Sequence, residues 1–187
     1  MVFGRGSGFE PNFIDTVEVP NYPGQMGLVA CPGTRLSKPE VPSKKLLPID
    51  LDNLSDWGAN GLICLLEYSE LSMHRIENLG EEAEARGLWF KHLPIVDMGV
   101  PTQEFEDEWA VEGERIRHAL RIGERVVFHC YAGLGRTGMM AARILVEMGM
   151  EHEAAIRNVR KTNRRRIQTK GQSNYVRHCY SLVDQAG

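Results

Sequence analysis

Residues 129–138 decide how this chain folds, and they read His129-Cys130-Tyr131-Ala132-Gly133-Leu134-Gly135-Arg136-Thr137-Gly138. The apolar run of residues 126–128 before them predicts a short buried strand, and residues 138–146 after them predict a helix. The glycine-rich loop therefore joins the end of a strand to the start of a helix. That order is typical of a sheet flanked by helices.

The loop has the chemistry of an anion-binding site. Unpaired backbone N–H groups and the positive end of the helix dipole favour an anion at a helix N-terminus. Glycines let the backbone curl so that successive amides point inward, and the planar fork of an arginine can hold two phosphate oxygens. We therefore expect a phosphate group to be bound by the loop residues Tyr131, Ala132, Gly133, Leu134, Gly135 and Arg136.

Cys130 stands where a nucleophile would attack that phosphate. Positive surroundings favour the thiolate form, which needs no separate base. We expect Thr137 to donate its hydroxyl hydrogen to the Cys130 sulfur when that sulfur departs. We expect His129 to hold the shape of the loop rather than to exchange protons.

Other interpretations of the stretch fit less well. A lone cysteine at a strand end is usually a small buried hydrophobe, but here Arg136 and the glycines accompany it. Residues 133–138 also match the dinucleotide-binding fingerprint, which requires a second parallel strand ending in an acidic residue about twenty positions on. Residues 151–160 look helical instead. A phosphate-binding loop of the nucleotidase type would need lysine in place of Arg136.

The alcohol that leaves the phosphate needs a proton from another segment. Residues 93–101, Leu-Pro-Ile-Val-Asp-Met-Gly-Val-Pro, predict a strand that ends in a turn. We expect Asp97 in that turn to act as general acid and later as base for the attacking water. The alternative is an ordinary turn aspartate that caps its own backbone. The reserve candidates look like acidic first turns of a helix: Glu104, Glu106, Asp107 and Glu108.

These two stretches resemble those of cysteine-based dual-specificity protein phosphatases, and within that class the kinase-associated phosphatase (cyclin-dependent kinase inhibitor 3-like) group. Residues 167–172, Ile-Gln-Thr-Lys-Gly-Gln, are similar to the Gln-Thr-x-x-Gln stretch of that class. Weaker likeness extends over about residues 28–183. The resemblance implies the roles given above for Cys130, Arg136 and Asp97, and it implies that Gln172 positions the attacking water. Read without the family, Gln168 and Gln172 are ordinary polar residues at a helix start.

The resemblance also implies fold and activity. We expect an α/β fold of the protein tyrosine phosphatase type, with a central, mostly parallel sheet flanked by helices and a C-terminal helical tail. The expected activity is hydrolysis of phosphotyrosine, and of phosphoserine or phosphothreonine, through a cysteinyl phosphate without metal or cofactor. No lysine lies between Cys130 and Arg136, which favours a phosphoprotein substrate over an inositol lipid. A small or non-protein phosphomonoester substrate, and a pseudo-enzyme that binds phosphoproteins, are the alternatives.

The length of 187 residues suits one core, and we expect a loosely ordered segment over residues 1–24 and a single domain over residues 25–187. The net charge of −3 gives no drive toward nucleic acid. No apolar stretch approaches the ~20 residues that span a bilayer, and residues 1–8 do not resemble a signal peptide, so we expect a cytoplasmic protein without membrane partners. The oligomeric state is not indicated.

The four cysteines are widely spaced and predict neither a disulfide framework nor a zinc site. Cys31 and Cys64 are expected to be buried thiols, or one of them could be the resolving partner of an oxidised Cys130. In the basic run of residues 160–166, we expect Arg164, Arg165 and Arg166 to rim the active site, and the earlier cations to favour a helix C-terminus.

Periodicity and turn residues predict the remaining elements. Strands are expected over residues 26–30, 61–66 and 88–93. Helices are expected over residues 50–59, 69–86 (throughout or in part), 102–122, 137–148, 151–162 and 171–185, and a proline-containing loop precedes the first of them.

Overall fold

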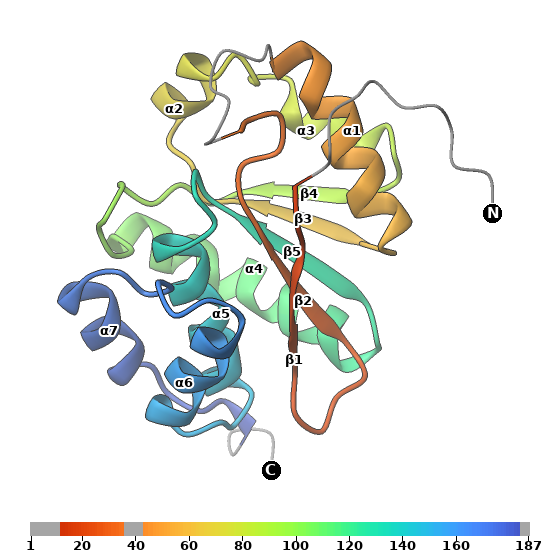
Figure 1. Cartoon of the computed structure of the whole chain (residues 1–187). Helices are drawn as coiled ribbons and strands as arrows, with labels where there is room; N and C mark the ends of the chain where they lie inside the picture. Colours follow the sequence, from red (N-terminus) through yellow and green to blue (C-terminus); the bar gives the residue numbers. More distant parts are fainter. Residues whose placement is uncertain (1–11, 36–42, 184–187) are drawn as a thin grey trace.

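The computed structural model describes residues 12–35 and 43–183, and its centre is a five-stranded sheet (Figure 1). The strands lie in the order β1-β2-β5-β3-β4. β1 is antiparallel to β2, and the other neighbours are parallel. Central parallel strands are covered on both faces, which is why they read as continuous apolar runs. The strands are β1 Asp15–Glu18, β2 Gln25–Val29, β3 Gly61–Cys64, β4 Trp89–His92 and β5 Arg125–His129.

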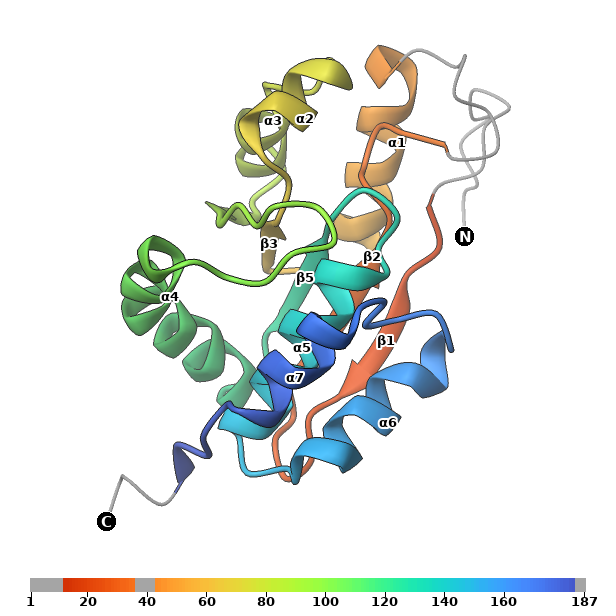
Figure 2. The same ribbon diagram turned by 90° about the vertical axis from the view of Figure 1, so that its left-hand side faces the viewer.

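Helices cover both faces of the sheet. α1 lies on the opposite side of the sheet from α5, α6 and α7 (Figures 1 and 2). The predicted α/β fold with a mostly parallel sheet and a C-terminal helical tail is confirmed. Within the described part of the chain, no helix combines the length and apolar character needed to cross a membrane. The helices are α1 Ser43–Asp56, α2 Tyr68–Met73, α3 Leu79–Glu84, α4 Gln103–Arg121, α5 Gly135–Glu147, α6 His152–Thr162 and α7 Lys170–Arg177.

The register of the sheet brings three loops to one edge. His129 at the end of β5 lies beside Val29 of β2 and Cys64 of β3. Beyond the strands, the Cys31 N–H donates to the Tyr131 carbonyl at 2.9 Å, and the Leu65 N–H donates to the His129 carbonyl at 3.0 Å. The glycine-rich loop therefore sits in the middle of the carboxyl edge of the sheet, where α/β sheets hold ligands.

The structure contains a strand that the sequence analysis missed. β1 lies inside the segment expected to be loosely ordered, and it pairs with β2 along its whole length. Only Val17 of its four residues is buried, so the strand leaves almost no hydrophobic pattern to detect. Its order comes from pairing with β2. Residues 1–11 of the same predicted segment lie outside the described residues.

The first and last helices also differ in extent from expectation. α1 begins at Ser43 and contains Pro48, although a proline inside a helix removes one backbone hydrogen bond. Four buried leucines of α1 (46, 47, 51 and 54) offset that loss, and residues 36–42 of the expected loop lie outside the described residues. Residues 69–86, predicted to be helical throughout or in part, are helical in part: α2 and α3 are separated by a break at Arg75, whose φ is +56°. The last helix ends at Arg177, and residues 184–187 lie outside the described residues.

The last residue of β5, His129, is completely buried among the strands. Burial lowers the pKa of its imidazole to about 3. The ring is therefore neutral at ordinary pH and does not exchange protons there.

This burial predicts a specific loss of stability in mild acid. The imidazole has a pKa of about 6.5 when unfolded and about 3 when folded, so between these values the unfolded chain binds the extra proton and stability falls as pH falls. Lowering the pH from 7 to 5 should reduce the free energy of unfolding by about 2 kcal/mol through this residue. Urea unfolding of His129→Gln should show a pH-dependent loss smaller by that amount, whereas exposed His178→Gln should match the wild type. Equal losses in all three proteins would contradict the prediction.

Candidate active site

The glycine-rich loop begins directly after β5 and ends at the first turn of α5. Cys130 is the first loop residue and is 3% exposed. Leu134 is the N-cap of α5, and Gly135 is its first helical residue. Gly133 has a φ of +69°, and a Cβ there would lie 2.5 Å from the Val29 carbonyl oxygen. Only glycine fits at this point, because both the backbone angle and the approach of β2 exclude a side chain.

Arg136, on the first turn of α5, is held by a carboxylate from another part of the chain. Its Nη1 donates to Glu70 Oε2 at 2.6 Å and to the Ile95 carbonyl at 3.0 Å, and its Nη2 donates to Glu70 Oε1 at 2.8 Å. The Nε atom is buried and has no hydrogen-bond partner among the described residues. The guanidinium fork is thus fixed in orientation, with one donor left over.

The Arg136–Glu70 pair keeps both charges despite its burial. Burial opposes the charge on Arg136, but the hydrogen bonds with Glu70 outweigh it and raise the pKa of the guanidinium. Burial likewise opposes the charge on Glu70, but Arg136 lowers the pKa of that carboxyl. The sequence analysis did not identify Glu70. A glutamate on a short helix, 66 residues from its partner, carries no local signal for this contact.

Asp97, the predicted general acid, lies beside Arg136 in the structure. Asp97 Oδ1 lies 3.1 Å from Arg136 Nη2, and the Asp97 side chain is 68% exposed. It stands in a turn closed by the Gly99 N–H, which donates to the Val96 carbonyl at 2.9 Å, with Met98 at a φ of +57°. The reserve carboxylates Glu104, Glu106, Asp107 and Glu108 all lie on α4. Their predicted position on a helix is confirmed.

Thr137 and Gln172 both lie near the loop, but only Gln172 makes side-chain hydrogen bonds. The Thr137 hydroxyl is buried and has no hydrogen-bond partner among the described residues, so the expected bond to the Cys130 sulfur is not formed here. Gln172 is buried; its Oε1 accepts from the Gln168 N–H at 2.9 Å, and its Nε2 donates to the Gly99 carbonyl at 3.2 Å. A Cβ on Gly135 would lie within 3.2 Å of the Gln172 amide. Gln172 therefore links α7 to the Asp97 turn and to the glycine-rich loop.

The expectation that Arg166 rims the site is wrong. Arg166 is buried and donates through Nη1 to the Gly133 carbonyl, while its Nη2 pairs with Asp15 of β1. Its Nε donates to Thr162 Oγ1 at 2.9 Å. Arg164 and Arg165 are exposed. Arg166 thus supports the loop through the Gly133 carbonyl. The cost of burying its guanidinium is offset by its contacts with Gly133, Asp15 and Thr162.

The cysteines Cys31 and Cys64 are buried thiols, as expected. Burial raises the pKa of Cys64 to about 12 and raises the pKa of Cys31 well above its usual value. Both are therefore protonated at neutral pH. All four cysteines are free.

Removing the support from Arg166 should damage both the loop and the fold. We expect Arg166→Met to lower the free energy of unfolding by about 3 kcal/mol, because Asp15 and the Gly133 carbonyl lose their partner. We also expect inorganic phosphate to bind about tenfold more weakly, as titration calorimetry would measure. The matched control is exposed Arg165→Met, with a stability change within about 0.5 kcal/mol. A larger loss of phosphate binding in the control would return the basic run to the rim of the site.

Comparison with known proteins identifies a family and several relatives of this chain. A model of the family described as polymorphic toxin system, DSP-PTPase phosphatase, matches residues 43–150, more than half of the chain. The chain is 34% identical over 90 residues to PRL-1 phosphatase of Drosophila melanogaster, covering 48% of this chain and 51% of the fly protein. It is 29% identical over 156 residues to cyclin-dependent kinase inhibitor 3 of Rattus norvegicus, covering 81% of this chain and 69% of the rat protein.

Solved structures have a similar fold. Kinase associated phosphatase, with its catalytic-site cysteine replaced by serine, superposes with a TM-score of 0.77 and 27% identity, covering 89% of this chain and 93% of that one. Tk-PTP in its active form has a TM-score of 0.61 at 20% identity, covers 91% of this chain and 97% of that one, and shows the fold alone. Because the family model covers the glycine-rich loop, the Asp97 turn and Glu70, the chain belongs to the DSP-PTPase phosphatase family.

Proposed function

We propose that this protein is a phosphoprotein phosphatase that hydrolyses phosphotyrosine, and phosphoserine and phosphothreonine, through a cysteinyl phosphate on Cys130. One observation carries the proposal. Arg136 is oriented by Glu70 with its Nε donor unpaired, and Asp97 reaches the same guanidinium at the mouth of the Cys130 loop. Nucleophile, phosphate clamp and proton donor therefore come from one small region.

The first step transfers the phosphoryl group to sulfur. Loop amides and the Arg136 guanidinium hold the phosphate oxygens, and their positive charge stabilises the transition state. The Cys130 thiolate forms a bond to phosphorus as the bond from phosphorus to the leaving oxygen breaks. That oxygen keeps the electron pair and takes a proton from the Asp97 carboxyl group.

The second step returns the enzyme to its starting state. Asp97, now a carboxylate, accepts a proton from a water molecule as the water oxygen bonds to phosphorus. The S–P bond breaks, and inorganic phosphate is released from the thiolate. Gln172, which contacts the Asp97 turn through the Gly99 carbonyl, positions this water. The unpaired Thr137 hydroxyl donates to the departing sulfur, and His129 holds the loop.

The surroundings of the loop favour a protein substrate. The rim residues Tyr131, Ala132 and Leu134 are partly exposed, and the loop carries no lysine. Arg136 is contacted by two segments, the Asp97 turn and α2. Both segments carry large exposed apolar side chains: Val96, Met98 and Val100 on the turn, and Tyr68 and Met73 on α2. Such exposed apolar groups suit the flanking side chains of a phosphoprotein better than a multiply charged head group. The similarity to kinase associated phosphatase supports this choice.

A cytoplasmic location is part of the proposal. The free cysteines suit a reducing compartment, whereas an oxidising one would threaten the Cys130 nucleophile.

Turnover in excess chelator tests the nucleophile. The wild type should hydrolyse p-nitrophenyl phosphate in EDTA under reducing conditions, because no step requires a metal. Cys130→Ser should lower kcat by more than about 1,000-fold, since a serine hydroxyl is not ionised at neutral pH and is a poor nucleophile. The matched control Cys179→Ser should retain activity. Activity that persists in Cys130→Ser would reject the thiolate mechanism. Wild-type protein that binds phosphate without turnover would indicate a pseudo-enzyme that binds phosphoproteins.

The dependence on the leaving group tests Asp97. Asp97→Asn should lower kcat/KM for phenyl phosphate by about 100-fold, because its alcohol departs poorly without a proton. For p-nitrophenyl phosphate, whose phenolate departs readily, the loss should stay below about tenfold. Exposed Asp56→Asn on α1 is the matched control and should leave both values unchanged. Equal losses for the two substrates would remove Asp97 from the acid role and direct attention to the acidic residues of α4.

A further inference from the structure

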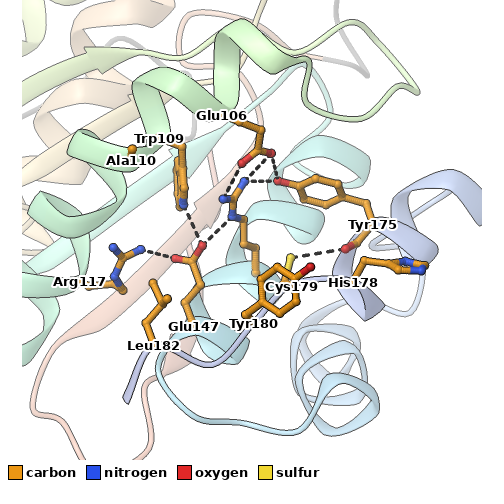
Figure 3. A pocket seen from close by; sticks show the side chains of 11 residues that line it. Glu106, Trp109, Ala110, Arg117, Glu147, Tyr175, His178, Cys179, Tyr180 and Leu182 are labelled. Carbon is orange, nitrogen blue, oxygen red and sulfur yellow. Dashed lines mark hydrogen bonds and ion pairs between the residues drawn. The ribbon is translucent and has the colours of Figure 1, made fainter. Parts of the chain in front are cut away.

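A cluster of polar side chains joins α4, α5 and α7 at the C-terminal half of α5, away from the glycine-rich loop (Figure 3). Arg143 of α5 donates to both oxygens of Glu106 of α4, at 2.9 and 2.8 Å. The Tyr175 hydroxyl of α7 donates to Glu106 Oε1 at 2.6 Å and accepts from Arg143. All three side chains line one cavity together with Trp109, and Figure 3 shows Glu106 and Tyr175 pointing toward each other there.

Arg143 and Tyr175 make further contacts in this cluster or are shielded from water. The Arg143 side chain is 10% exposed, and its Nε donates to Glu147 Oε1 at 2.7 Å. Its guanidinium also lies over the Trp109 ring at 4.6 Å from the ring centre, which adds a cation–π contact. Burial raises the pKa of Tyr175, so the phenol stays protonated and keeps donating to Glu106.

The helices joined here are the ones that border the Asp97 turn. Glu106 lies near the start of α4, whose N-cap Thr102 follows Asp97 by five residues. Tyr175 lies three residues after Gln172, which donates to the Gly99 carbonyl inside the turn. Arg143 lies on the same helix as Arg136, which Asp97 contacts. The turn is thus followed directly by α4 and contacted by Gln172 of α7. Through Glu106 and Tyr175, both helices contact Arg143 of α5.

We propose that Glu106, Arg143 and Tyr175 position Asp97 over the phosphate loop, acting through the start of α4 and through Gln172 of α7. None of the three touches the substrate; they are positioning residues. The inference rests on the proposed role of Asp97 as general acid. A misplaced acid lowers the rate only where the leaving group needs its proton, so the cluster should affect catalysis selectively.

The first test uses Tyr175→Phe, which removes one hydroxyl and leaves the ring in place. We expect kcat/KM for phenyl phosphate to fall about tenfold through kcat, while the value for p-nitrophenyl phosphate changes less than about twofold. Glu106→Gln should show the same selectivity. Tyr180→Phe, which alters an exposed tyrosine of the same cavity, is the matched control and should change neither value. Equal losses for both substrates, or no loss, would overturn the inference and leave a purely structural cluster.

A double-mutant cycle with Asp97→Asn makes the test independent of stability. If the cluster acts through Asp97, Tyr175→Phe should lower kcat/KM for phenyl phosphate by less than about twofold in the Asp97→Asn background. A further tenfold loss in that background would overturn the inference. If Asp97→Asn itself shows no dependence on the leaving group, the proposed function fails instead, so the two failures are distinguishable. Thermal unfolding of each variant confirms that the comparison is made between folded proteins.

Discussion

The buried pair between Arg136 and Glu70 is the interaction on which the rest of the site depends. A buried ion pair adds little net stability, because desolvation of both charges offsets their attraction. Its value here is directional. Two parallel hydrogen bonds to Glu70 fix the plane of the guanidinium, and the Ile95 carbonyl, two residues before Asp97, accepts from Arg136 Nη1. One side chain thereby brings the loop, α2 and the Asp97 turn into a single geometry.

The glycine-rich loop is supported by its own helix and by a distant arginine. It leads directly into the start of α5, where the helix dipole favours an anion. Arg166 donates to the Gly133 carbonyl and pairs with Asp15. Because Asp15 belongs to β1, Arg166 connects the edge strand to the glycine-rich loop. The support also explains why an arginine near the site is buried rather than offered to a substrate.

A gradient of rigidity follows from these contacts. The Cys130 loop is packed between β2 and α5 and has little freedom to move, whereas the Asp97 side chain is largely exposed. A group that must donate a proton and then recover it needs access to water and a controlled position at the same time. The turn combines the two, because the Asp97 side chain reaches solvent while Gln172 of α7 donates to the Gly99 carbonyl and α4 begins shortly after the turn.

By itself, the sequence determined the features that are local along the chain. The strand, glycine-rich loop and helix around Cys130 follow from hydrophobic pattern and backbone requirements within ten residues, and the turn at Asp97 follows from its prolines and glycine. These stretches also carry the family resemblance. They sufficed for the fold class and for the main candidates of the site.

Tertiary structure alone decided the contacts between distant segments. Glu70 and Arg136 are 66 residues apart, and Asp15 and Arg166 are 151 apart. No spacing rule links such pairs, because the sheet register and helix packing bring them together only when the chain is folded. The same reason hid β1, whose order depends on pairing with β2 rather than on its own side chains. Periodicity reports which face of an element is buried, and it cannot report which partner covers that face.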